Sequence, residues 1–124
     1  MRLYIGGTAQ GKLSYVLHRE SRTAWADGAV CPFEEAFGGL VLNRFHLLLR
    51  RLLSEGGDIP AFLERLLAEN PQAVIICDEV GSGIVPMEKF EREYREAVGR
   101  ACCVLAEKAE RVERIACGIG LRLK

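Results

Sequence analysis

The feature that most constrains this chain is the segment GGTAQGK at residues 6–12, which has the spacing G-x-x-x-x-G-K of a phosphate-binding loop. A short apolar run at residues 3–5 precedes it, and residues 11–22 can continue as a helix. The glycines of such a loop let the backbone bend, so that successive N–H groups and the helix N-terminus converge on phosphate oxygens. The pattern therefore predicts a strand at 2–5, a phosphate loop, and a helix at 11–22.

The predicted nucleotide-binding residues are those of the loop and the two that follow it: Gly6, Gly7, Thr8, Ala9, Gln10, Gly11, Lys12, Leu13 and Ser14. Lys12 is expected to place a positive charge beside the β- and γ-phosphates. The motif calls for Ser or Thr at the next position, where a hydroxyl binds Mg²⁺, and this chain has Leu13. Ser14 would point about 100° away on a helix. The alternative is a glycine-rich turn that binds nothing.

Composition describes a globular chain and excludes several function classes. The 124 residues suit a single domain, 1–124, and 49% apolar with 27% charged residues argues against disorder. Seventeen basic residues balance seventeen acidic ones, so we expect no binding to nucleic acid through bulk charge. No apolar run approaches the roughly 18 residues of a membrane span, so we expect no membrane partner.

Cysteine usage and the first residues favour a cytoplasmic location. Five cysteines are an odd number, and none forms a C-x-x-C pair, which argues against a disulfide framework and a zinc site. The glycines at 6 and 7 interrupt the apolar start of the chain, so the pattern does not predict a signal peptide.

The rest of the chain alternates helical and strand patterns. The predicted elements are an irregular stretch at 23–39 with a short helical piece at 33–37 and no convincing strand, helices at about 41–54 and 58–69, a strand at 73–77, a long helix from 86 or 87 to about 112, and a strand at 114–117. Asp58 is expected to cap its helix. The long helix is expected to bury a stripe of Met87, Phe90, Tyr94, Ala97, Val98, Ala101, Leu105 and Val112. This alternation predicts an α/β fold around a small, mainly parallel sheet of three or four strands.

A second candidate segment follows the apolar strand at 73–77. Ligands of parallel α/β sheets bind at the carboxyl ends of strands, where this strand delivers Asp78 and Glu79 in the layout of a Walker B segment. Asp78 is predicted to hold Mg²⁺, and Glu79 to orient or deprotonate a nucleophile. The alternative is a turn with two solvated acids. The following residues, Val80, Gly81, Ser82 and Gly83, are assigned to a substrate loop.

Other polar and aromatic residues have simpler interpretations. His18 and His46 are expected to lie on helix faces rather than to act as nucleophile or ligand, and Trp25 to be buried rather than to stack on a base. The arginines are expected to form the solvated side of two helices: Arg44, Arg50, Arg51 and Arg65.

The two motifs together resemble the adenosylcobinamide kinase / adenosylcobinamide-phosphate guanylyltransferase family of cobalamin biosynthesis. The most specific part is E-V-G-x-G-I-V-P at residues 79–86, and residues 90–106 and 121–124 are also similar. Members of this family phosphorylate adenosylcobinamide and then transfer GMP through a guanylylated histidine. The resemblance implies a three-layer, RecA-like P-loop NTPase fold, ATP or GTP with Mg²⁺, adenosylcobinamide as a partner, and a homo-oligomer.

The chain differs from that family at several points. The family is longer, and the segment that carries its histidine nucleophile is largely absent, since neither His18 nor His46 lies in a matching motif. Asn43 stands where the family has an Asp, and Asp78 where it usually has Asn.

Two functions of different class follow. The first is an enzyme that transfers a phosphoryl group, or a guanylyl group, from ATP or GTP to cobinamide, with Lys12 and Glu79 as catalytic residues. The second is a catalytically impaired relative that binds nucleotide or a corrinoid as a sensor or assembly partner. A phosphate-loop kinase for an unrelated small molecule is disfavoured by the segment at 79–86.

Overall fold

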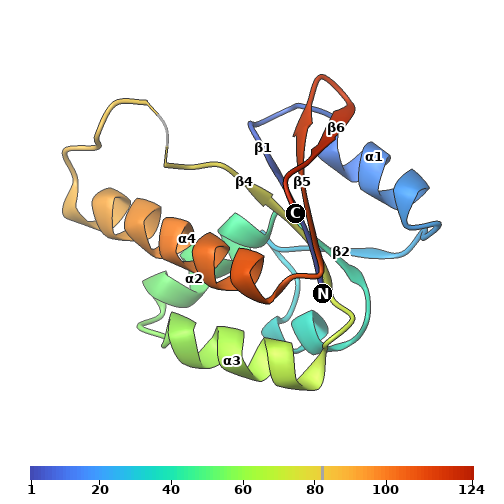
Figure 1. Cartoon of the computed structure of the whole chain (residues 1–124). Helices are drawn as coiled ribbons and strands as arrows, with labels where there is room; N and C mark the ends of the chain where they lie inside the picture. The colour runs from blue at the N-terminus through green and yellow to red at the C-terminus, as the bar shows by residue number, and fades with distance from the viewer. Residues whose placement is uncertain (82) are drawn as a thin grey trace.

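A computed structural model describes residues 1–81 and 83–124 of the chain. Its elements in order are β1 Arg2–Gly6, α1 Lys12–Arg19, β2 Trp25–Asp27, the 3₁₀-helix η1 Phe33–Phe37, β3 Val41–Asn43, α2 Phe45–Ser54, α3 Ile59–Glu69, β4 Val74–Asp78, α4 Lys89–Lys108, β5 Arg111–Ala116 and β6 Ile119–Arg122 (Figure 1). None of the helices in the described part of the chain is long and apolar enough to cross a membrane.

The strands form one mainly parallel sheet in the order β2-β3-β4-β1-β5-β6. β1 lies in the middle, parallel to β4 on one side and to β5 on the other, and only β6 runs antiparallel, against β5. The register of β1 with β4 places Gly6 directly beside Asp78. The glycine-rich loop after β1 and the acidic segment after β4 therefore leave neighbouring strands at the same end of the sheet.

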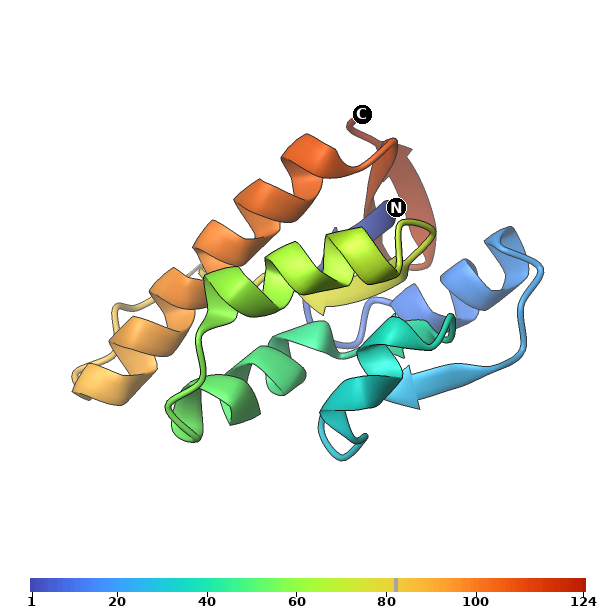
Figure 2. The same cartoon turned by 90° about the horizontal axis from the view of Figure 1, so that it is seen from below.

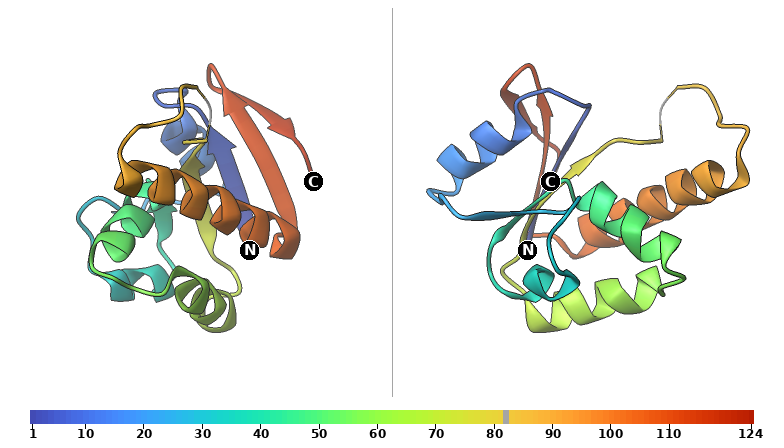
Figure 3. Two further views of the ribbon diagram at one scale, coloured as in Figure 1. Left: turned by 90° about the vertical axis from the view of Figure 1, so that its left-hand side faces the viewer. Right: turned by 180° about the vertical axis from the view of Figure 1, so that it is seen from behind.

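Helices cover both faces of the sheet, which gives three layers. In Figures 1 and 2, α1 lies on one face, and α2, α3 and α4 lie on the other. Figure 3 shows α4 crossing that second face. Because side chains alternate along a strand, Leu3 enters the large core under α2–α4, whereas Tyr4 enters a smaller core under α1. This arrangement confirms the predicted α/β class with a mainly parallel sheet.

The predicted helix at 41–54 is wrong at its start, and the strand count was too low. Residues 41–43 form β3, which pairs with β2 and β4, and the helix begins only at Phe45. Arg44 separates the two with a φ of 53°, in the left-handed region that interrupts both strand and helix. β2 and β3 have three residues each, and β3 pairs with strands on both sides whereas β2, at the edge, pairs with β3 alone. The described residues therefore form a sheet of six strands, and β2 lies in the stretch 23–39 where no convincing strand was predicted.

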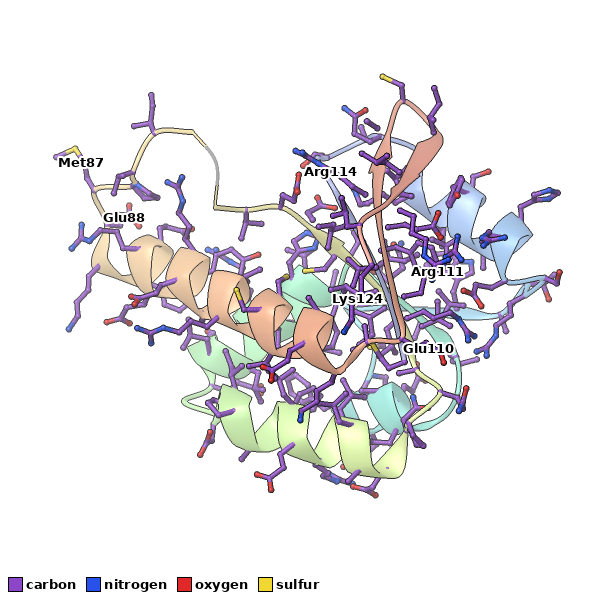
Figure 4. The ribbon with its side chains drawn as sticks, in the orientation of Figure 1. Met87, Glu88, Glu110, Arg111, Arg114 and Lys124 are labelled. Carbon is purple, nitrogen blue, oxygen red and sulfur yellow. The ribbon has the colours of Figure 1, made fainter. Side chains whose placement is uncertain are left out.

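The long helix and Trp25 also differ from prediction. α4 spans Lys89–Lys108, and Val112 belongs to β5 rather than to the helix. Met87 precedes the helix with 92% of its surface exposed, and Figure 4 shows it at the end of the molecule away from the sheet. The inner half of the predicted stripe is buried as expected, namely Tyr94, Val98, Ala101 and Leu105. Trp25 lies on the edge strand β2 and is 43% exposed, so its predicted burial is wrong.

The cap of α3 is as predicted. The carboxylate of Asp58 accepts a hydrogen bond from the backbone N–H of Ala61 at 3.0 Å, and Pro60 stands in the first turn.

Candidate functional site

The carboxyl end of the sheet holds a cavity of about 270 Å³ between the loop after β1 and the ends of β3 and β4. Figure 1 shows the loops after β1 and β4 and the β5–β6 turn at this end. The cavity is lined by Thr8, Ala9, Gln10, Gly11, Lys12, Leu13, Ser14, Asn43, Arg44 and Asp78. The structure thus brings most of the predicted loop together with Asp78.

The loop after β1 is held in a bent conformation by its neighbours. Ala9 and Gly11 have φ angles of 57° and 80°. The β5–β6 turn fastens the loop, because the amide of Cys117 donates to Gln10 Oε1 at 2.7 Å and the amide of Gly118 donates to the Gln10 carbonyl at 2.8 Å. A Cβ on Gly11 would also lie 3.4 Å from the Gly118 backbone. The loop is therefore shaped before any ligand arrives.

Lys12 and Asp78 form an ion pair at the floor of the cavity. The Lys12 ammonium lies 2.7 Å from Asp78 Oδ1 and donates to the Gly7 carbonyl at 2.5 Å, with 7% of the side chain exposed. The Thr8 hydroxyl donates to Asp78 Oδ2 at 3.1 Å. The Lys12 ammonium therefore points into the loop, where an anion could accept hydrogen bonds from it. In this structure the Asp78 carboxylate is its anionic partner.

His46 is the residue of this site that the helical pattern missed. It lies in the first turn of α2, 6% exposed, and its Nδ1 accepts a hydrogen bond from the Asp78 backbone N–H at 3.2 Å. The proton of the neutral ring is therefore on Nε2, which lies 3.5 Å from Asp78 Oδ2. Helical spacing shows which residues share a helix face but not which strand lies beside that helix. The pairing of β3 with β4, which brings His46 to Asp78, therefore could not be predicted from the sequence around His46.

His46 provides a pH test of this packing. Burial lowers the pKa of His46 below its ordinary 6.5, and Lys12 and Arg44 lower it further, whereas Asp78 opposes them. The unfolded chain then takes up a proton near pH 6.5 that the folded chain does not, so stability is full above that pH and falls as the pH decreases below it. Urea unfolding of the ligand-free protein at about pH 7.5 and about pH 5.5 measures the loss.

The control for this prediction is the other histidine. His46→Asn keeps an acceptor for the Asp78 amide and should flatten the pH dependence, whereas His18→Asn, on the exposed side of α1, should leave it as in the wild type. An unchanged pH dependence in His46→Asn would contradict this account of His46.

The cavity offers oxygen ligands that suit Mg²⁺ carried with a nucleotide. Leu13 supplies none, since it packs partly buried against the small core under α1. Asp78 and Asn43 are among the lining residues whose side chains carry oxygen atoms, the donors that Mg²⁺ prefers. Among residues 1–81 and 83–124 no group of three or more His, Cys, Asp or Glu side chains could hold a metal ion. Asp78 and Asn43 are therefore the residues that would contribute ligands to such an ion.

Glu79 and the loop after it face a neighbouring cavity. Glu79 Oε2 lies 3.1 Å from Arg114 Nη2 on β5, and Figure 4 shows Arg114 beside the β5–β6 hairpin. A space of about 220 Å³ beside it is lined in part by Asp78, Glu79, Val80 and Gly81. The Arg95 guanidinium binds the carbonyls of Gly81 and Gly83, at 2.5 and 3.1 Å. Ser82, also assigned to the substrate loop, lies outside the described residues.

The prediction that four arginines form the solvated side of two helices holds only in part, because Arg44 and Arg65 are exposed, whereas Arg50 and Arg51 are partly buried, and Arg44 precedes its helix. Arg51 donates to the carbonyls of Gly28 and Cys31, at 2.9 Å each, and lies over the ring of Phe33. Arg50 pairs with Glu91 and stacks on Phe90 and Tyr94 of α4. Arg65 pairs with Glu34 and Glu69, and Arg44 borders the cavity at the ends of β3 and β4. These side chains join elements that are distant in sequence.

Comparison with known proteins adds an independent finding. Residues 40–123 match the model of the family described as cobinamide kinase / cobinamide phosphate guanyltransferase. The chain is 38% identical over 53 residues to the bifunctional adenosylcobalamin biosynthesis protein CobU of Salmonella typhimurium, and equally to that of Escherichia coli. Each match covers 43% of this chain and 29% of the relative. The region that matches the family begins after the glycine-rich loop at residues 6–12, so the family match does not include that loop.

Proposed function

The chain belongs to the cobinamide kinase / cobinamide phosphate guanyltransferase family, and from that membership we propose that it is a nucleotide-dependent phosphotransferase of cobalamin biosynthesis. In this proposal ATP or GTP is the donor, Mg²⁺ accompanies it, and the terminal hydroxyl of adenosylcobinamide is the acceptor. Residues 1–124 would act as one nucleotide-binding domain. The strand order, with β4 between β1 and β3, supports a RecA-like arrangement.

The observation that carries this proposal is the meeting of Lys12 and Asp78 in a cavity bounded by a bent glycine-rich loop. A lysine with 7% exposure, oriented by a loop carbonyl, is suited to bind phosphate oxygens. A surface lysine in an ordinary turn would have no such partners, so the geometry favours phosphate binding over the simple turn.

Each side chain then has a definite task. Lys12 and the loop amides, from Gly6 to Ser14, bind the phosphates and neutralise charge that develops on them. Asp78, held by Thr8 and His46, would bind Mg²⁺, which supplies charge neutralisation and geometry to the phosphates. Glu79 would accept the proton of the attacking hydroxyl, and the loop at 80–83 would contact the acceptor.

The geometry favours phosphoryl transfer over guanylyl transfer. The chain has two histidines, His18 and His46. His18 is exposed on α1, and both ring nitrogens of His46 face Asp78. Neither is placed as a free nucleophile at the cavity, so we propose the kinase reaction as the principal activity.

A second candidate is a relative that binds nucleotide without turnover. It is favoured by Leu13, whose side chain is in the small core where the motif requires a hydroxyl for the metal. In that case nucleotide or corrinoid binding would serve sensing or assembly, and a homo-oligomer would be a natural form for it.

The deciding experiment is titration with ATP and GTP, with and without Mg²⁺, followed by the same with adenosylcobinamide present. Phosphorylated cobinamide, detected by mass spectrometry, would support the kinase. Nucleotide binding without product would favour the second candidate, and no binding of either nucleotide would refute both.

A further inference from the structure

Arg44 is a cation at the phosphate cavity that the phosphate-loop motif does not include. It follows β3 directly, has a φ of 53°, and lines the cavity with Lys12 and Asp78. A non-glycine residue in this region is uncommon and persists only where the surroundings enforce it. Its side chain is 48% exposed, so the guanidinium is accessible to a ligand.

The β2 strand holds that guanidinium in one orientation. Arg44 Nε donates to Asp27 Oδ1 at 2.9 Å, and Nη2 donates to Asp27 Oδ2 at 2.5 Å. Asp27 is itself fixed, since its Oδ1 also accepts the Ala29 amide at 3.0 Å. The turn after β2 packs so closely that a Cβ on Gly28 would lie 2.2 Å from the Arg44 carbonyl. The two hydrogen bonds to Asp27 use Nε and one N–H of Nη2. Because a guanidinium has five N–H donors, the others remain available to a ligand.

Charge at the cavity leaves a role for Arg44. Lys12 and Asp78 pair with each other at 2.7 Å, and Asp27, which pairs with Arg44, does not belong to the cavity lining. The lining therefore holds two cations, Lys12 and Arg44, each paired with one carboxylate, and the remaining N–H groups of Arg44 are available to an entering polyphosphate. Leu13 stands where the motif has a neutral hydroxyl that binds the metal, so a fixed guanidinium would add positive charge beside the phosphates without replacing that ligand.

We propose that Arg44 is a second phosphate-binding residue, whose guanidinium binds a non-bridging oxygen of the same polyphosphate that Lys12 binds. This inference rests on the proposed function, because it takes the cavity as a polyphosphate site. Asp27 orients the fork of Arg44 and remains its partner on the side away from the cavity.

The test measures the affinity for inorganic tripolyphosphate by calorimetry in wild type, Arg44→Ala, Arg44→Lys and Lys12→Ala. We expect Arg44→Ala to weaken binding about 10- to 100-fold, as for loss of a charge-assisted hydrogen bond. Arg44→Lys should lose less, since it keeps the charge but not the fork. If Arg44→Ala does not fold, the affinity of Arg44→Lys relative to the wild type still tests the proposal.

The matched control is Arg65→Ala. Arg65 is 46% exposed and also joins separate elements through carboxylates, but it lies away from the cavity. If Arg44→Ala loses no more affinity than Arg65→Ala while Lys12→Ala loses binding, the role of Arg44 is refuted and the phosphate site stands. If the wild type does not bind tripolyphosphate, or Lys12→Ala binds it as well as the wild type, the proposed function fails and this inference fails with it.

Discussion

Replacing Lys12 by alanine will weaken ATP and GTP binding by about 100-fold or more, because a buried ammonium aimed at the loop is lost. The same change will also lower stability, since Asp78, 15% exposed, is left without its cation. Calorimetric titration and thermal unfolding of one preparation measure the two effects separately.

A double variant distinguishes loss of binding from loss of folding. Lys12→Ala with Asp78→Ala removes both charges, so it should recover stability relative to Lys12→Ala while nucleotide affinity stays low. Lys89→Ala is the surface control, because Lys89 is 84% exposed and pairs with Glu93 at 3.7 Å on the same helix. A Lys12→Ala protein with full nucleotide affinity would eliminate the phosphate-loop interpretation.

Replacing Asp78 by alanine will have opposite effects on binding and on turnover. Without Mg²⁺ the affinity for ATP should rise several-fold, because the carboxylate that now pairs with the Lys12 ammonium at 2.7 Å no longer competes with phosphate. With Mg²⁺, cobinamide phosphorylation should fall about 100-fold, since the charged oxygen ligand at the cavity is gone. Binding with and without Mg²⁺, together with a product assay, measures both.

Two further variants decide where the metal is held. Leu13→Ser in the Asp78→Ala background restores the hydroxyl of the motif, so partial recovery of turnover would locate the ion between the two positions. Asp58→Asn removes a carboxylate from the cap of α3 but keeps its acceptor oxygen, and it should behave as the wild type. If Asp78→Ala keeps full Mg²⁺-dependent turnover, Asp78 is not a metal ligand.

Strong local patterns predicted much of this fold. The glycine spacing at residues 6–12 required a strand before it and a helix after it, and β1 and α1 lie there. The apolar run at 73–77 was continuous because β4 is covered on both faces, with Ile75 toward one core and Ile76 toward the other. The cap of α3 could be predicted because it depends only on the Asp58 side chain and the backbone N–H of Ala61, three residues further along the chain.

Short strands escaped prediction because their stability comes from pairing. β2 and β3 have three residues each, too few for a period, and the strand-like residues 40–42 run directly into the helical spacing of 45–53. Only the neighbouring strands, which bond to their backbone groups, and the left-handed Arg44 decide that a strand ends there and α2 begins. β6 is stabilised in the same way by β5.

The residues of the candidate site also fall into two groups, those that local sequence placed correctly and those that only strand pairing placed. The sequence by itself determined that Lys12 would stand at the start of a helix after a glycine loop, and that Asp78 would leave a buried strand, because both follow from local chain geometry. Tertiary structure alone decided that His46 supports Asp78 and that Arg44 borders the cavity, because β3 is inserted beside β4 and carries them there. Contacts between strands depend on pairing across long sequence separations, and no local pattern records them.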